Sequence, residues 1–193
     1  GYGEDGQVWG FEMMAFTPTS YRRIGALLPF RLPGSDSAVL DPRRAALSLL
    51  ICALGGDGAK VDVGLAPREL NVLVRMVETG FNSPMASSCG RLFDAVSAMI
   101  GVCRSTTYEG QPAIELESAS SPAEEGSYPY ELTSSGLITL DHRPMVRAIV
   151  EDAVAKTPKG VIAARFHNTL VKAMAEMIRM GAETQDSRRV AVG

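Results

Sequence analysis

A polar stripe between positions 87 and 94 holds the residues of this sequence best suited to bind a ligand. Ser87, Gly90, Arg91 and Asp94 fall on one side of a predicted helix, because each helical residue advances about 100° around the axis. Apolar residues fall on the opposite side, at Leu92, Phe93, Val96, Met99 and Ile100. The polar side therefore combines a hydroxyl group, a residue without a side chain, a cation and a carboxylate.

Two interpretations of this stripe are open. Arg91 and Asp94 could form an ion pair three residues apart on a solvated helix face, which stabilises a helix by roughly 0.2–0.5 kcal/mol. Alternatively, the stripe binds a nucleoside. Gly90 would then let a base or sugar approach the helix closely, and Asp94 would accept hydrogen bonds from ribose hydroxyl groups. The pattern alone does not separate a solvated face from a ligand face.

The opening segment GYGEDG is a second candidate for ligand contact. Its backbone N–H groups suit an anion and its glycines permit close approach, with Gly1, Gly3 and Glu4 as candidate contacts. The glycine spacing matches neither a dinucleotide fingerprint nor a phosphate-binding P-loop. A simple tight turn is the alternative interpretation.

Histidine and cysteine form no recognisable site. His142 and His167 have no partner at metal-ligand spacing, and no CxxC pair occurs, so we expect no bound transition metal. His142 follows a turn and is expected to be exposed. His167 lies at the edge of an apolar helix stripe, where a packed, hydrogen-bonded side chain is favoured over a catalytic base. We interpret the cysteines as small buried hydrophobic residues, at Cys52, Cys89 and Cys103.

Composition limits the class of protein. The 193 residues are 46% hydrophobic and 21% charged, which is typical of a globular protein. A net charge of -3 without a long Lys/Arg run argues against nucleic-acid binding, which needs clustered cations. The longest apolar stretch, residues 45–56, is about half the length of a membrane span. We therefore expect a cytoplasmic protein that binds neither nucleic acid nor membrane.

Turn and cap residues divide the chain into elements that position these candidates. Glycine and proline signals predict strands over residues 8–16 and 21–30, and alternation predicts a short strand at 113–117. A polar loop at 118–127 leads to a hairpin at 128–140 that turns at 134–136. Proline and cap residues predict helices at residues 42–53, 67–79, within 84–101, 144–156 and 158–180, the last ending at Gly181.

The order of these elements indicates an α+β fold, or an α/β fold cut out of its context. It is helix-rich with small β elements. We divide residues 1–193 into four regions of one partial domain: a strand and turn region at 1–34, a helical region at 35–112, a strand and hairpin at 113–140, and C-terminal helices at 141–193.

Several blocks of the sequence resemble the HypF family of hydrogenase-maturation carbamoyltransferases. GYGEDGQVWGFE resembles the family's GYGEDG-x-x-WGGE, with Phe11 in place of its second glycine. SSCGRLFDAVSAMIG resembles SSAGRLFDAVAALLG, and YEGQPAIELE resembles YEGQAAMELE. FRLPGSDSAVLDPRRAAL and ARFHNTL resemble two further blocks, in the same order. The resemblance covers nearly the whole chain.

The resemblance implies part of an actin/Hsp70-like ATPase fold and a nucleotide site. The family is similar to enzymes that make threonylcarbamoyladenosine in tRNA, whose GEAFDK block faces the nucleotide ribose. Asp94 matches the aspartate of that block, while Arg91 stands where those enzymes have glutamate. Gly110 matches a glycine near the adenine. Nucleotide-binding residues are therefore expected at Gly90, Arg91, Asp94 and Gly110.

The family's reaction uses ATP and carbamoyl phosphate to form carbamoyladenylate, and then carbamoylates the C-terminal cysteine of HypE. That group becomes cyanide for the [NiFe]-hydrogenase. The family's HHHAH metal motif is not in this sequence, so metal binding is expected of the parent protein alone. We expect a truncated segment that is inactive by itself, and a homodimer would cover surface that a missing sheet buries. Two alternatives are an inert scaffold domain and a small-molecule O-carbamoyltransferase.

Overall fold

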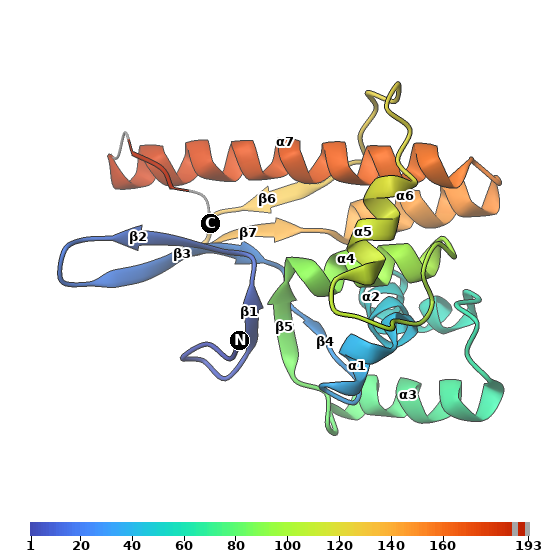
Figure 1. The fold of residues 1–193 in the computed structure, drawn as a ribbon. Coiled ribbons are helices and arrows are strands. Elements are labelled where there is room, and N and C mark those ends of the chain that lie inside the picture. Colours follow the sequence, from blue (N-terminus) through green and yellow to red (C-terminus); the bar gives the residue numbers. More distant parts are fainter. Residues whose placement is uncertain (187–188, 192–193) are drawn as a thin grey trace.

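The computed structural model describes residues 1–186 and 189–191. Residues 187–188 and 192–193, at the end of the region expected to hold the C-terminal helices, lie outside the described residues. Two small sheets lie next to a block of short helices, and one long helix extends over both (Figure 1). This arrangement confirms a helix-rich α+β fold with small β elements.

The first sheet has three strands in the order β1-β5-β4. These are β1 (Val8–Gly10), β5 (Met85–Ser88) and β4 (Phe30–Arg31). β5 is the central strand and pairs parallel with β1 and antiparallel with β4. The sequence did not predict β5, because its four residues stand directly before a helix and show no alternation of their own.

The second sheet has four strands in the order β2-β3-β7-β6. These are β2 (Glu12–Phe16), β3 (Tyr21–Leu27), β7 (Ile138–Asp141) and β6 (Glu131–Thr133). The predicted C-terminal hairpin is confirmed as the antiparallel pair β6-β7. The two N-terminal strand predictions were each too long, because residues 8–16 and 21–30 both cross from one sheet to the other.

Seven α-helices and one 3₁₀ helix occur in the described residues. They are α1 (Ser37–Leu40), α2 (Pro42–Leu54), η1 (Gly55–Lys60), α3 (Pro67–Thr79), α4 (Cys89–Met99), α5 (Gln111–Ser118), α6 (Arg143–Val154) and α7 (Lys159–Gln185). The proline-based starts of α2 and α3 are confirmed. Asp41 caps α2 by accepting a hydrogen bond from the Arg43 amide, and Gly80 ends α3 with a φ of 77°.

The prediction of a strand at residues 113–117 was wrong, because this segment lies in α5. Pro112 occupies the first turn of the helix, and it is buried together with Leu116, one turn later. Gln111 also donates a hydrogen bond to Glu115 over 2.7 Å. The alternation in the sequence resembled a strand only because the helix is short.

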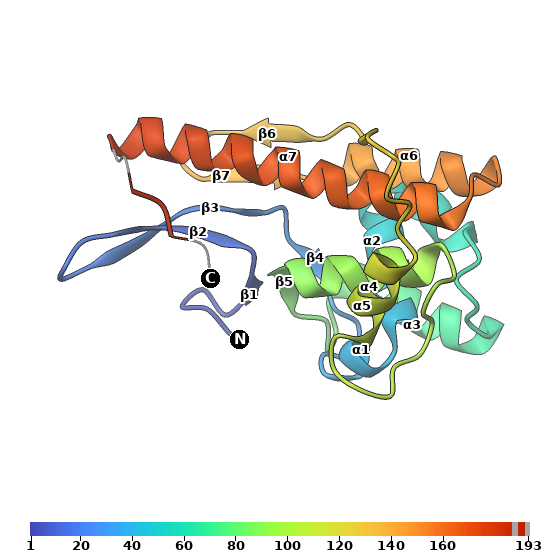
Figure 2. The ribbon, with the colours of Figure 1, turned by 45° about the horizontal axis from the view of Figure 1, so that its top comes forward.

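The long helix α7 continues past Gly181, where the sequence predicted its end. A Cβ atom at Gly181 would lie 2.7 Å from the Met13 side chain of β2, so this glycine lies inside α7 and allows the helix to pack closely against β2. The predicted apolar stripe of α7 is confirmed as buried, at Ile162, Phe166, Leu170, Ala173 and Met177. α7 therefore packs on the second sheet and on the helical block (Figures 1 and 2).

The core lies between α2, α4 and the two sheets. Small residues allow close approach, since Ala45 and Ala46 of α2 and Ala95 and Ala98 of α4 are all fully buried. α5 covers a further side of α4, as both ribbon views show. Both neighbours hold α4 in place directly after β5. None of the described helices is both long and apolar enough to cross a bilayer.

Candidate functional site

The candidate site begins where β5 becomes α4. Ser88 ends the strand and caps the helix, because its hydroxyl accepts a hydrogen bond from the Arg91 amide over 3.4 Å. The side chain of Ser88 also touches β1, where a Cβ atom at Gly10 would lie 2.8 Å from its Oγ. The carboxyl ends of the parallel strands β1 and β5 and the first turn of α4 therefore meet at one place.

Asp94 is buried, contrary to its predicted place on a face away from the core. Asp94 is 2% exposed, and its Oδ2 lies 2.9 Å from Arg91 Nη1. The predicted ion pair between Arg91 and Asp94 is confirmed, but the interpretation that places this pair on a solvated face was wrong. The reason is packing on more than one side, since α2 and α5 both cover α4 and residues 94–99 are all buried.

Burial changes the proton affinity of this carboxyl group. Desolvation raises the pKa of Asp94 to about 6, although the Arg91 guanidinium acts in the opposite direction. Asp94 Oδ2 accepts no hydrogen bond of good geometry from any described residue, despite its ion-pair contact. The carboxyl group can therefore gain or lose a proton near neutral pH.

Two of the predicted site glycines leave room for a ligand. A Cβ atom at Gly90 would meet only Ser88 Oγ, at 3.7 Å, and Gly90 is exposed on the first turn of α4. A Cβ atom at Gly110 would meet nothing within 4 Å. Gly110 has a φ of 80° and precedes α5, which packs on α4. Both positions allow another molecule to approach the backbone closely.

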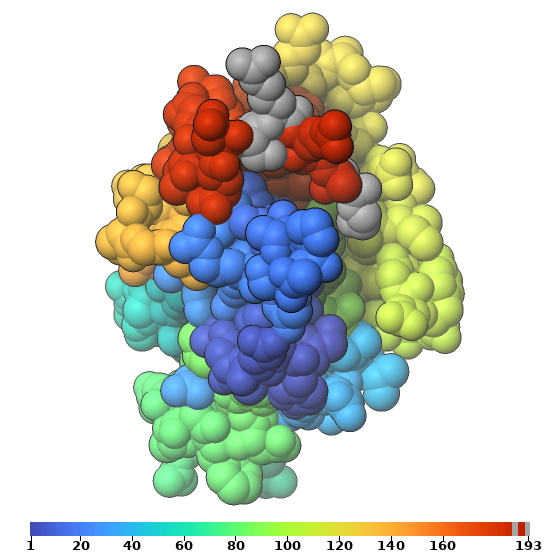
Figure 3. Space-filling view, turned by 90° about the vertical axis from the view of Figure 1, so that its left-hand side faces the viewer, coloured from blue at the N-terminus to red at the C-terminus, as the bar shows by residue number. Residues whose placement is uncertain are grey.

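The GYGEDG loop forms a turn on an exposed surface, seen in dark blue in Figure 3. Gly6 has a φ of 75° and its amide donates a hydrogen bond to the Gly3 carbonyl. A Cβ atom at Gly3 would overlap the Trp9 ring at 2.1 Å, so packing explains this glycine. Gly1 has open space where a side chain would be, and Glu4 accepts a hydrogen bond from Tyr21.

A partly buried polar network, which the sequence did not predict, connects this loop to the start of α4. Arg23 of β3 forms ion pairs with Asp5 of the loop at 2.9 Å and with Glu12 of β2 at 3.0 Å. It also donates a hydrogen bond to the Ser87 hydroxyl over 3.1 Å. Its guanidinium lies 4.5 Å from the centre of the Trp9 ring. Arg23 therefore holds the loop, both sheets and β5 together.

Glu12 completes the network. Its carboxylate accepts hydrogen bonds from the amides of Gly10 and Phe11, at 2.6 and 2.8 Å, and from the Ser87 hydroxyl. Glu12 corresponds to the last residue of the WG-x-E block, so the sequence contained one signal for it. Arg23 carried no comparable signal, since a single arginine in a strand is usually a surface residue.

The two histidines lie in different environments from one another. His142 was predicted to be exposed, but it is fully buried. Its Nε2–H donates to the Leu28 carbonyl over 3.0 Å, and burial lowers its pKa to about 4. The packed, hydrogen-bonded interpretation of His167 is confirmed, because its Nδ1–H donates to the Ala163 carbonyl over 2.7 Å and its ring contacts Phe93.

The cysteines show no sign of an activated thiolate. All three are free, with Cys103 buried and Cys52 and Cys89 half-buried. Burial raises the pKa of Cys89, the cysteine at the start of α4, to about 11. A thiol with this pKa is protonated at neutral pH and is a poor nucleophile.

The described residues do not fit the metal ion that the resemblance assigns to the parent protein. They include no group of three or more His, Cys, Asp or Glu side chains that could hold one. No chemical step at this site is therefore assigned to a metal.

Comparison with protein families gives a match over residues 1–193 to the family described as "Carbamoyltransferase, Kae1-like Domain, second subdomain". The chain is 34% identical over 211 residues to carbamoyltransferase HypF of Synechocystis sp., covering 100% of this chain and 27% of that protein. It is also 34% identical over 200 residues to HypF of Rhizobium leguminosarum, covering 100% and 25%. The chain thus spans about a quarter of the length of these relatives.

Two solved structures share the fold. The full-length HypF structure in its phosphate- and nucleotide-bound form matches with a TM-score of 0.89 and 32% identity, over 96% of this chain and 24% of that one. The HypF structure from T. kodakarensis matches with a TM-score of 0.75 and 26% identity, over 97% and 26%. The fold is therefore that of one segment within these two larger structures.

Proposed function

The chain belongs to the HypF carbamoyltransferase family, and from this premise we propose that it forms the nucleotide side of a carbamoyl-transfer site. The complete enzyme would use ATP and carbamoyl phosphate, through carbamoyladenylate, to carbamoylate the C-terminal cysteine of a HypE-type maturation protein. The carbamoyl group would then supply cyanide for the [NiFe]-hydrogenase. The chain spans about a quarter of the length of these relatives, so the complete activity is proposed for a protein of their full length.

The observation that carries this proposal is the junction of three features at the start of α4. The GYGEDG loop is tied through Arg23 to Ser87, and Ser88 caps the helix on which Gly90 is exposed. A nucleotide needs backbone amides for its phosphates and an uncrowded surface for its sugar and base. The related full-length HypF structure is described as nucleotide-bound, which supports a nucleotide for this segment.

We assign different roles to the candidate residues. Gly90 and Gly110 would form the surface that the nucleoside approaches, because neither has a neighbour that blocks it. Arg91 would face the ligand, since its side chain is 14% exposed, whereas that of Asp94 is 3% exposed. Asp94 would hold the Arg91 guanidinium in position. A direct contact between Asp94 and a ribose would require Arg91 to move aside.

Chemistry in this segment would consist of binding and orientation. The only histidine near α4, His167, is used in packing, and the Cys89 thiol is protonated, so neither supplies a base or nucleophile among the described residues. Holding an adenylate and its acceptor together can by itself lower the barrier, since it replaces a bimolecular encounter by a pre-oriented one. The acceptor thiol belongs to the HypE-type partner.

A transfer assay with the full-length protein tests this proposal. The protein is incubated with ¹⁴C-labelled carbamoyl phosphate and a HypE-type partner, with and without ATP. We expect ATP-dependent label on the partner and none when its C-terminal cysteine is replaced by alanine. Label on a small-molecule hydroxyl group would favour an O-carbamoyltransferase. Partner binding without any transfer would favour an inert scaffold, and either result would overturn the proposal.

A further inference from the structure

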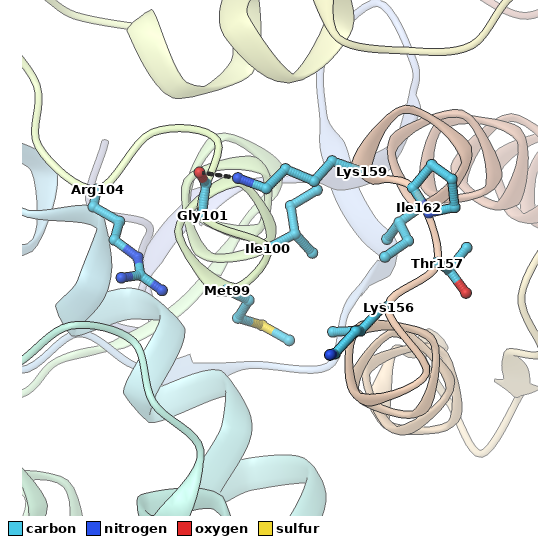
Figure 4. Close-up of a pocket in the computed structure, with 10 residues that line it drawn as sticks. Met99, Ile100, Gly101, Arg104, Lys156, Thr157, Lys159 and Ile162 are labelled. Atoms are coloured by element: carbon cyan, nitrogen blue, oxygen red, sulfur yellow. Dashed lines mark hydrogen bonds between the residues drawn. The ribbon is translucent and has the colours of Figure 1, made fainter.

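A cavity of about 600 Å³ lies at the opposite end of α4 from the candidate nucleotide site. It is bounded by the carboxyl end of α4 and by the turn between α6 and α7 (Figure 4). Since α4 has 11 residues, its two ends are about 16 Å apart. The cavity is therefore separate from the surface around Gly90, and it falls in the size range of small-molecule sites.

Three cations line this cavity. They are Arg104, Lys156 and Lys159, and no carboxylate is among the described residues that line it. Lys159 donates to the Gly101 carbonyl over 2.6 Å, while Arg104 makes only long contacts of 3.5 Å with two carbonyl groups. None of the three forms an ion pair with a side chain among the described residues. An anion would relieve their mutual repulsion.

The backbone at Lys156 brings its side chain to this cavity. Lys156 has a φ of 59°, a left-handed conformation that glycine adopts more easily than lysine. The turn is held by hydrogen bonds from the Lys156 amide to Ala153 and from the Thr157 amide to Asp152, at 3.1 and 2.9 Å. This is the usual left-handed turn that ends a helix, here α6, and Lys156 is one of the residues that line the cavity. Figure 4 shows Lys156 and Met99 among these residues.

An apolar hollow of about 380 Å³ extends the cavity along α6. Met99, Ile100 and Ala153 line both spaces, so the two lie next to each other. The hollow is walled mainly by Val61, Ile149, Val150 and Val154. Val154 is 78% exposed, which is high for a valine beside a hollow. Of the two charged residues in its lining, Lys60 pairs with Asp57, and Asp62 accepts a hydrogen bond from the Gly64 amide.

We propose that this cavity and its apolar extension bind a small amphipathic organic anion. Its phosphate or carboxylate group would lie among Arg104, Lys156 and Lys159, and its apolar body would lie along Met99, Ile100 and Val154. Arginine can bind two oxygens of such a group at once, and lysine adds a point charge. This site is independent of the proposed nucleotide site.

The test measures binding of three probes to the full-length protein by calorimetry, below any micellar concentration. Octyl phosphate has both the anionic group and the apolar body, whereas inorganic phosphate and octanol each have one. We expect octyl phosphate to bind at least ten-fold more tightly than either of the others. Lys156→Glu should weaken the binding of octyl phosphate at least ten-fold. Val154→Glu should also weaken the binding of octyl phosphate, and it should not strengthen the binding of inorganic phosphate.

A matched substitution at another exposed lysine provides the control. Lys172 is also an exposed lysine, but it lies further along α7 and donates to the Ser127 hydroxyl over 2.9 Å. Lys172→Glu should leave octyl phosphate binding unchanged. Equal losses from Lys156→Glu and Lys172→Glu would show general charge attraction and overturn the proposal. Absence of octyl phosphate binding to the full-length protein would overturn it as well.

Discussion

At the scale of single residues, Arg91 and Asp94 form an ion pair within the packing of α4, where their side chains are 14% and 3% exposed. The i,i+3 spacing predicted the ion pair, which is present at 2.9 Å. The same helical geometry predicted exposure, because it assumes one packed face and one free face. Asp94→Ala is therefore expected to cost about 1–3 kcal/mol, more than an exposed pair would, because it leaves Arg91 without its buried partner.

The pH dependence of stability tests the burial of Asp94. Its pKa is raised to about 6 in the folded state from about 3.8 in the unfolded chain, so the folded state binds the extra proton. Its contribution to stability is fully present below about pH 4 and is lost as pH rises through about 6. Relative to Asp94→Asn, which remains neutral, the wild-type protein should lose up to about 3 kcal/mol of unfolding free energy across that interval.

His142 acts in the opposite direction over a similar interval, so the comparison with Asp94→Asn is essential. Its pKa is lowered to about 4 by burial, and its contribution is therefore lost as pH falls from about 6.5 towards 4. Both proteins in the comparison contain His142, so its effect cancels. Denaturant unfolding at pH 4, 5, 6 and 7 measures the difference. Parallel curves for the two proteins would show that Asp94 is not desolvated.

Arg23 is expected to be the most important single polar residue for stability around the GYGEDG loop. Arg23→Met would leave the Glu12 carboxylate, whose side chain is 9% exposed, with backbone amides and Ser87 but no cation. We expect a loss of about 2–4 kcal/mol. The control is Arg179→Met on α7. Arg179 forms an ion pair with Glu176 at 3.9 Å, and the Arg179 side chain is 69% exposed. Arg179→Met should lower the unfolding free energy by less than about 1 kcal/mol. Equal losses of stability for Arg23→Met and Arg179→Met in thermal unfolding would contradict a stabilising role of the Arg23 network.

At the scale of elements, the starts of α2 and α3 were more predictable than the strands. Asp41-Pro42 and Pro67 each specify a helix start through the capping side chain or the proline ring itself. The local sequence was therefore enough to predict where these helices begin. The strands β1, β4 and β5 have three, two and four residues, and they exist because of partners far away in the chain. A pattern so short cannot show which sheet a residue joins.

Two glycines of η1 provide an element-scale prediction. A Cβ atom at Gly58 would lie 2.4 Å from the Leu50 backbone of α2, whereas one at Gly56 would meet nothing within 4 Å. Gly58→Ala should therefore force η1 away from α2 and destabilise the protein by about 1–3 kcal/mol. Gly56→Ala should change stability by less than about 0.5 kcal/mol. Urea unfolding of the two variants measures this difference. Similar urea midpoints for Gly58→Ala and Gly56→Ala would mean that η1 does not pack on α2 as described.

At the scale of the whole molecule, recognisable sequence blocks predicted the family and the fold, and the match to full-length HypF confirms both. These blocks converge in space for a reason that the sequence did not show. The GYGEDG loop and the start of α4 are about 80 residues apart, and β1, β5 and Arg23 bring them together. The candidate residues were predictable one by one, but their connection required the sheets.

The most direct measurement is the nucleotide affinity of the full-length protein after Gly90→Leu. Gly90 is exposed and its Cβ position is open, so leucine should preserve or slightly raise the melting temperature because it favours the helix. Gly56→Leu makes the same change at another open, exposed glycine and serves as the control. We expect Gly90→Leu to weaken adenine-nucleotide binding at least ten-fold and Gly56→Leu to leave it unchanged. Unchanged affinity in a folded Gly90→Leu protein would contradict a nucleotide site at the start of α4.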